Sequence, residues 1–181
     1  MTFAPFLSDP VVVHAAAAAI GIILIVSALA KLRDLELFRY AVDNYGLLDG
    51  PAAALFARAF PWLELLAGLA LIPETARLFG VLLALAVLAI ATGGVAVALL
   101  RGAGRIECGC GNGNQRISWA LVGRNLGLAA ITTLAAAEEL PRSLGPVDYF
   151  SVAGAILALL VVYAAANQLL ANQPLLKELQ S

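Results

Sequence analysis

The residues best suited to redox chemistry lie in one polar, glycine-rich stretch, 105–114, of an otherwise very apolar chain. This stretch contains both cysteines of the protein, Cys108 and Cys110, separated by a single glycine. A disulfide between them would close a very small, strained ring. Strained disulfides are easily reduced and tend to be catalytic or regulatory. The spacing therefore predicts that Cys108 and Cys110 exchange electrons rather than staple the fold.

Charged residues flank the cysteine pair on both sides. Arg105 and Arg116 would favour the reactive thiolate form of a nearby cysteine. Glu107 would oppose that effect if ionised, or could carry a proton. An alternative for both arginines is the ordinary enrichment of basic residues beside membrane spans.

Two other interpretations apply to the cysteines themselves. They could be inert thiols, because free cysteine often behaves as a small apolar residue. A structural zinc site needs four ligands, and the only histidine, His14, is far away in the sequence. No metal site is predicted.

Composition indicates an integral membrane protein. Of 181 residues, 62% are hydrophobic and only 13% are charged, whereas aqueous domains carry about 25% charged residues. The mean hydropathy is +0.92. The net charge of −1 gives no basic surface for nucleic acid. We expect a single integral membrane domain over residues 1–181, with no separate aqueous domain.

Apolar runs predict an all-α, polytopic membrane helix bundle. Segment 34–46 alternates charged and apolar residues at helical spacing, which is typical of an amphipathic helix lying in the membrane interface. Short turns at 73–76 and 141–146 predict that the spans they join are antiparallel neighbours. The five predicted transmembrane helices are 11–30, 55–72, 78–100, 117–137 and 147–170.

Several residues inside these spans have predicted roles. Pro61 should kink or restart the second span. Glu64 should face the interior of the bundle, because an ionised group in lipid is costly. Gly93, Gly94 and Ala89 should form a small-residue face for close helix packing. Arg124, followed by Asn125, should lie at membrane depth and face protein, where it could tune the thiols or make a structural bond.

The distribution of basic residues predicts the orientation in the membrane. Nine of the eleven lie on one side of the predicted spans, and only Arg77 and Arg142 lie on the other. Because basic residues accumulate on the cytoplasmic side, we expect a multi-pass protein of the bacterial inner membrane with its N-terminus outside and its C-terminus in the cytoplasm. The cysteine stretch then belongs to the cytoplasmic side.

Three motifs together resemble the MauE family, within the wider group of DoxX-like membrane proteins. They are SALAKLRD at 27–34, PWLELLAG at 61–68, and ECGCG at 107–111 followed by Arg124 and Asn125. The first two are shared across DoxX-like proteins, and the cysteine pair is what indicates MauE. The resemblance covers roughly residues 20–137.

The resemblance implies a role in maturing methylamine dehydrogenase. The small subunit of that enzyme carries a quinone cofactor and many disulfides and is assembled in the periplasm. The implied partners are this subunit and MauD, a thioredoxin-like protein. The periplasmic client is in tension with a cytoplasmic cysteine stretch, unless the thiols reach into the membrane or the charge count misleads.

The preferred hypothesis is a thiol–disulfide relay in which Cys108 and Cys110 form a mixed disulfide with a thioredoxin-like partner. No bound cofactor is predicted, although a quinone in the bilayer is a possible electron partner. The alternative is a non-catalytic membrane scaffold or transport subunit for assembly of the same enzyme, in which the cysteines are incidental.

Overall fold

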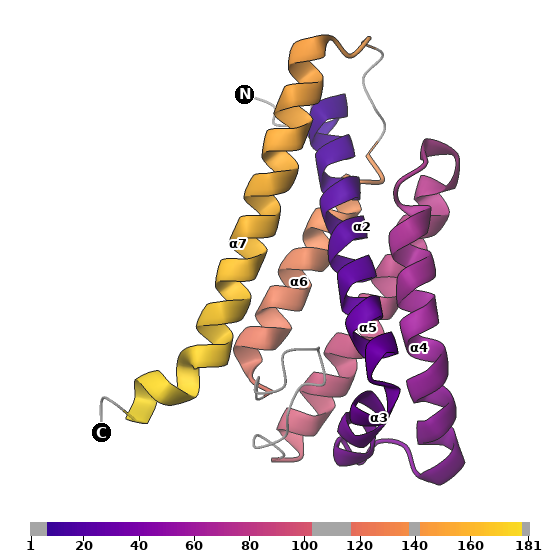
Figure 1. Ribbon diagram of the computed structural model, residues 1–181, viewed down its shortest axis with the longest axis vertical. Coiled ribbons are helices and arrows are strands. Elements are labelled where there is room, and N and C mark those ends of the chain that lie inside the picture. The colour runs from indigo at the N-terminus through magenta and orange to yellow at the C-terminus, as the bar shows by residue number, and fades with distance from the viewer. Residues whose placement is uncertain (1–6, 103–116, 138–141, 179–181) are drawn as a thin grey trace.

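The computed structural model describes residues 7–102, 117–137 and 142–178, and side chains as far as residue 172. Every regular element in these ranges is helical. Figure 1 shows them as a bundle of long helices with one short helix, α3, beneath it. The elements are α2 (Pro10–Arg33), α3 (Leu35–Asn44), α4 (Gly50–Ala70), the 3₁₀ turn η1 (Glu74–Ala76), α5 (Arg77–Leu100), α6 (Trp119–Leu134) and α7 (Pro146–Glu178).

Four stretches of the described chain are long and apolar enough to cross a membrane: Pro10–Arg33, Gly50–Ala70, Glu74–Leu100 and Pro146–Asn172. The all-helical prediction is confirmed, but five predicted transmembrane helices become four. The predicted span 117–137 is α6, whose 16 residues reach only about 24 Å, short of a hydrocarbon core of roughly 30 Å. The backbone of Ser118 is still extended, and the chain leaves the helix after Leu134, so neither end of the predicted span is helical.

The long helices alternate in direction, with α2 running through the middle of the bundle (Figure 1). The helix pairs α4–α5 and α5–α6 pack together, and α2 contacts α4, α6 and α7. The antiparallel pairing of α4 with α5 was predicted from their short connection. α7, however, packs mainly against α2 and touches α6 much less. Adjacency in sequence therefore predicted the pairing of α4 with α5 better than the pairing of α6 with α7.

Glycines allow a close crossing of α2 and α4, but they are not the predicted ones. A Cβ on Gly21 of α2 would lie 2.9 Å from the carbonyl oxygen of Gly68, and a Cβ on Gly68 of α4 would lie 2.8 Å from that of Gly21. Only glycine permits backbones to approach so closely. A Cβ on Gly93 would meet nothing within 4 Å. The predicted packing face of Gly93, Gly94 and Ala89 is thus wrong, because Ala89 and Gly93 are exposed and a Cβ on Gly94 would meet only Leu47, at 3.9 Å.

Helix α4 continues through Pro61 without interruption. The prediction that the proline could restart the helix is therefore wrong. Proline removes the hydrogen bond that its own N–H would have made to the preceding turn. Pro61 is fully buried against the rest of the bundle.

The amphipathic helix α3 lies where segment 34–46 was predicted. Asp34 caps its start, accepting a hydrogen bond from the backbone N–H of Leu37 at 2.9 Å. Its apolar face buries Phe38, Ala41 and Val42, and the helix packs against α4. Gly46, at φ +59°, turns the chain after the helix. The packing of α3 under the bundle gives the interior one aromatic wall.

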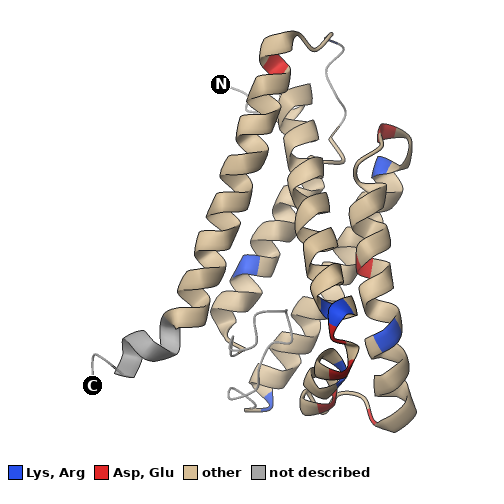
Figure 2. Ribbon diagram, viewed as in Figure 1, with Lys and Arg blue, Asp and Glu red and all other residues tan. Residues whose placement is uncertain are grey.

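Charged residues gather at the two ends of the bundle, mainly around α3 (Figure 2). At the opposite end, Arg142 forms ion pairs with Asp9 at 3.1 Å and with Asp148 at 3.0 Å. His14 and Glu74 approach to 3.0 Å at that end too. Hydrogen bonding from Arg142 is the main reason that the pKa of Asp9 lies below its ordinary value. These contacts tie together the ends of α2, α5 and α7.

Candidate functional site

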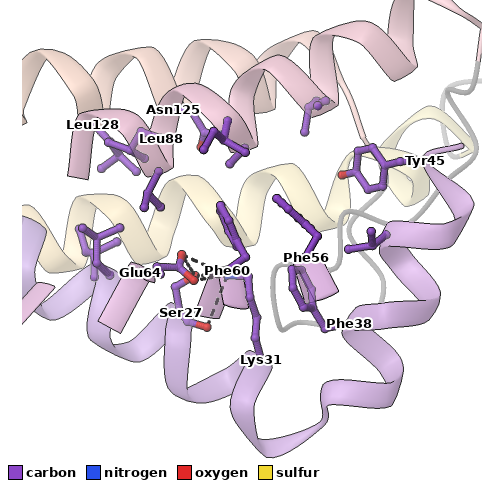
Figure 3. A pocket seen from close by; sticks show the side chains of 18 of the residues that line it. Ser27, Lys31, Phe38, Tyr45, Phe56, Phe60, Glu64, Leu88, Asn125 and Leu128 are labelled. Atoms are coloured by element: carbon purple, nitrogen blue, oxygen red, sulfur yellow. Dashed lines mark hydrogen bonds and ion pairs between the residues drawn. The ribbon is translucent and has the colours of Figure 1, made fainter. Parts of the chain in front are cut away.

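A buried ion pair joins α2 to α4 inside the bundle. The Lys31 ammonium nitrogen lies 2.8 Å from Oε2 and 3.1 Å from Oε1 of Glu64, and the two residues are 6% and 5% exposed. Ser27, one helical turn before Lys31, accepts from the ammonium at 2.6 Å and donates to Glu64 Oε1 at 2.8 Å. Figure 3 shows the three side chains converging. Each charge is thus neutralised and hydrogen-bonded, as burial requires.

Glu64 faces the interior of the bundle, as its charge predicted. Its partner was missed, because Lys31 was counted among the basic residues of the cytoplasmic side. The four-residue spacing of Ser27 and Lys31 places both on one face of a helix. The spacing of Ser27 and Lys31, together with the single acidic residue Glu64 in the next span, could have predicted the ion pair.

A second polar cluster lies on α6 and α7. The guanidinium of Arg124 donates from Nε and Nη2 to Oδ1 of Asn125, at 3.2 and 2.9 Å, and from Nη1 to Oδ1 of Asn167 at 2.5 Å. It also lies 5.6 Å from the centre of the Tyr163 ring. Arg124 is half-buried and Asn125 is buried, so the prediction that Arg124 faces protein is confirmed. Within the described part of the chain, its hydrogen-bond partners are all neutral.

Both clusters line one cavity of about 330 Å³. Apolar side chains from every helix of the bundle make up most of its wall, and Phe60 stacks between Phe38 at 6.2 Å and Phe56 at 4.9 Å between ring centres. In Figure 3 the ion pair and Asn125 lie on opposite walls, with Phe60 and Phe56 between them. The sequence patterns did not predict this cavity, because it depends on how α3 closes the bundle.

One end of the cavity lies beside the two points where the cysteine stretch joins the bundle. Arg101, at the end of α5, donates to the carbonyl oxygen of Gly46 at 3.1 Å. Ile117 is buried in a cluster with Val95 and Leu121, and Tyr45 packs against this cluster. Val95 and Tyr45 also line the cavity. Burial raises the pKa of Tyr45 to about 12.

The remaining predicted site residues lie outside the described part of the chain: Arg105, Glu107, Cys108, Cys110 and Arg116. Their proposed roles stay predictions. Among the described residues, no three histidine, cysteine or acidic side chains are grouped so as to hold a metal ion.

Comparisons with known proteins agree with one another. The family model described as "Methylamine utilisation protein MauE" matches residues 9–138. The chain is 38% identical to a methylamine utilization protein MauE of Methylorubrum extorquens, over 88% of each chain. It is 33% identical to the MauE protein of Paracoccus denitrificans, over 92% of this chain and 91% of that one. No solved structure gives a significant match.

Proposed function

The chain belongs to the MauE family of methylamine utilisation proteins, and from this premise we propose that it matures methylamine dehydrogenase by thiol–disulfide exchange. Cys108 and Cys110 would be the reacting pair. The partners would be a thioredoxin-like protein, MauD, and the small subunit of the dehydrogenase.

The observation that carries the proposal is the attachment of the cysteine stretch to the bundle. Gly102 ends α5 at φ +80°, and Ile117 is buried against α5 and α6 on the far side of the stretch. Both attachment points lie at the same end of the bundle, beside Tyr45 and Val95 of the cavity wall. The described residues that flank the cysteine stretch thus lie at the same end of the bundle as part of the cavity wall, which supports a joint role for the cysteine pair and the bundle.

The exchange itself requires no cofactor. A thiolate of one cysteine attacks a disulfide of the partner, which forms a mixed disulfide and expels a partner thiolate. The second cysteine then attacks the mixed disulfide, which releases the partner as a dithiol and leaves Cys108 and Cys110 oxidised. The reverse sequence transfers electrons in the opposite direction. A nearby cation lowers the pKa of a thiol and so increases the thiolate fraction.

Cysteine substitution tests the proposal. Cys108→Ser and Cys110→Ser should each abolish accumulation of active methylamine dehydrogenase, at membrane levels matched to the unsubstituted protein. One of the two variants should trap a mixed disulfide with a thioredoxin-like partner, because the attacking thiol is left without its resolving neighbour. Full activity from the double Cys→Ser protein would reject thiol exchange.

A scaffold role is the second candidate, and helix α7 favours it. None of the residues in the apolar window of α7 is buried within the bundle, so most of a long helix is available to another membrane protein. Alkylation of the thiols in cells separates the two functions. A cysteine pair that never becomes oxidised supports the scaffold and contradicts the relay.

The proposed orientation has its own test. Lys31 and Arg33 end α2, Arg39 lies on α3 and Arg101 follows α5, whereas Arg77 begins α5 at the opposite end and Arg142 precedes α7 there. Figure 2 shows more Lys and Arg toward the α3 end, which favours a cytoplasmic α3 end. Reporter fusions after residues 45 and 181 should therefore report the cytoplasm, and fusions after 75 and 145 the outside. The opposite pattern would reverse the orientation and place the cysteine stretch on the periplasmic side.

A further inference from the structure

We propose that the cavity lined by helices α2 to α7 binds the ring of a lipid-soluble quinone. This deepens the proposed function, since a quinone would be the electron partner of the cysteine pair. The inference rests on three properties of the described residues: the apolar wall, the unused hydrogen-bond donors, and the stacked aromatic side chains.

The wall determines how a ligand must reach the cavity. Apart from the two polar clusters, it consists of aliphatic and aromatic side chains such as Leu24, Val87, Leu88 and Leu128. Among the helices that line the cavity, α2, α4, α5 and α7 are long and apolar enough to span the membrane. A cavity of about 330 Å³ lies at the lower end of the size range of small-molecule sites. It would hold a substituted ring while a long apolar tail remained in the lipid. The ligand should therefore be a membrane-soluble molecule.

The donors determine which polar atoms the ligand must carry. A guanidinium has five N–H groups, and Arg124 directs three hydrogen bonds to Asn125 and Asn167. Two N–H groups are left over among its described contacts. The amide nitrogen of Asn125 likewise makes no hydrogen bond to another described side chain. The Lys31 ammonium, by contrast, is fully engaged by Ser27 and Glu64. A ligand carrying carbonyl oxygens would satisfy the donors of Arg124 and Asn125.

The charge of this wall favours a ligand that becomes more negative. Lys31 and Glu64 cancel each other at 2.8 Å. Arg124 has only neutral hydrogen-bond partners among the described residues, so the cavity as a whole carries an excess positive charge. A quinone oxygen gains negative charge as the ring accepts electrons, and a cation in a poorly solvated site stabilises that charge. Phe38, Phe56 and Phe60 all line the cavity, and a ligand ring can pack against this aromatic wall, for example edge to face.

The electron balance is complete with this ligand. Oxidation of two thiols to one disulfide releases two electrons and two protons. A quinone takes up both to become a quinol, and the new S–S bond is the only bond formed between protein atoms. The quinol then leaves to the bilayer.

Photoaffinity labelling with an azido derivative of decylubiquinone tests binding directly. The purified full-length protein carries Cys108→Ser and Cys110→Ser, so that binding is measured without thiol chemistry. Labelling should be saturable, should be displaced by excess decylubiquinone, and should map to peptides of α3, α4 or α6. Displacement by a phospholipid without a ring, to the same extent, would show a lipid site and overturn the proposal, as would the absence of saturable labelling.

Neighbouring glycines on α5 provide a matched pair of variants. Gly94 lines the cavity, and a Cβ there would meet only Leu47 at 3.9 Å, so Gly94→Leu fills the space without a clash at Cβ. Gly93 is exposed and meets nothing within 4 Å, so Gly93→Leu is the control. Gly94→Leu should lose most of the labelling and Gly93→Leu should keep it; equal labelling of the two overturns the site. Arg124→Met should weaken binding roughly tenfold or more, because a charge-assisted hydrogen bond is lost.

The two proposals fail separately. If the labelled site is real but the double Cys→Ser protein still matures the dehydrogenase, thiol exchange is wrong and the cavity stands. If cysteine substitution abolishes maturation but the ring does not bind, the electron partner lies elsewhere and the cavity assignment is wrong. Reduction of decylubiquinone by pre-reduced protein with intact cysteines, absent in Gly94→Leu, would support both.

Discussion

The two polar clusters of the cavity wall differ in how their charges are satisfied. On α2 and α4, Lys31 and Glu64 form a closed pair in which each charge has an opposite charge and a hydroxyl partner. On α6 and α7, Arg124 is held by two side-chain amides and one aromatic ring. The described residues place no acid against it.

This difference indicates that the two cations of the cavity wall, Lys31 and Arg124, have different roles. A closed pair has little left to offer a ligand, and it connects two helices that also meet at Gly21 and Gly68. A half-buried cation with neutral partners keeps both charge and donors available. We therefore expect substitutions at the closed pair to change mainly stability, and substitutions at Arg124 to change mainly function.

Breaking the closed pair from one side should have the largest effect on stability. Glu64→Leu leaves a buried ammonium without its counter-charge, and such changes cost about 3–5 kcal/mol. Lys31→Leu with Glu64→Leu removes both charges and should recover most of that loss. Denaturant unfolding of the purified proteins in detergent measures both. If the double variant is no more stable than Glu64→Leu, the pair is not what the single change disrupts.

The helix crossing beside the pair should be the next most sensitive position. Gly68→Ala places a Cβ 2.8 Å from the carbonyl oxygen of Gly21, so α2 and α4 must move apart at a cost of about 1–3 kcal/mol. Gly93→Ala is the control, because a Cβ there meets nothing within 4 Å. It should be neutral or stabilise the helix by about 0.5–1 kcal/mol. Equal stability of the two variants in the same unfolding experiment would show that the crossing is not tightly packed.

Arg124 should respond in the opposite way to Glu64. Arg124→Met leaves two amide oxygens without their donor but strands no charge, so the loss should be only about 1–2 kcal/mol. Maturation of methylamine dehydrogenase should nevertheless fall sharply at matched membrane levels. A protein that unfolds as readily as Glu64→Leu, or that keeps full activity, would remove the contrast between the clusters.

The sequence predicted the parts of this arrangement that depend on local pattern. Apolar runs located α2, α4, α5 and α7, and alternating charge located α3. The cost of an isolated charge in lipid indicated that Glu64 and Arg124 face protein. Such arguments concern one helix at a time.

The rest depends on contacts between helices. Lys31 looked like a residue of the cytoplasmic side, because nothing along the chain shows that its ammonium turns inward to Glu64 across the α2–α4 contact. Gly93 and Gly94 looked like a packing face, because glycine permits close approach but does not say which helix approaches. The cavity arises from α3 folding under the bundle, which no periodicity encodes.

The smallest predicted effect concerns the ion pairs of Arg142 at the end of the bundle opposite α3. These pairs are partly exposed to solvent, unlike the buried pair of Lys31 and Glu64. Hydrogen bonding from Arg142, and then from the backbone N–H of Val11, lowers the pKa of Asp9 below its ordinary value of 3.8. The resulting stabilisation is therefore fully present above that value and is lost as the pH falls through the lower pKa of the folded protein.

Asp9→Asn keeps an oxygen to cap α2 but loses the charge, so the fall in stability below about pH 4 should be shallower. Because both partners of the pair are partly exposed, solvent and salt should keep the effect at neutral pH near zero. Unfolding measured across acid pH at low and high salt checks this, and an unchanged acid slope in Asp9→Asn would mean that Asp9 is no more acidic in the folded protein than in the unfolded chain.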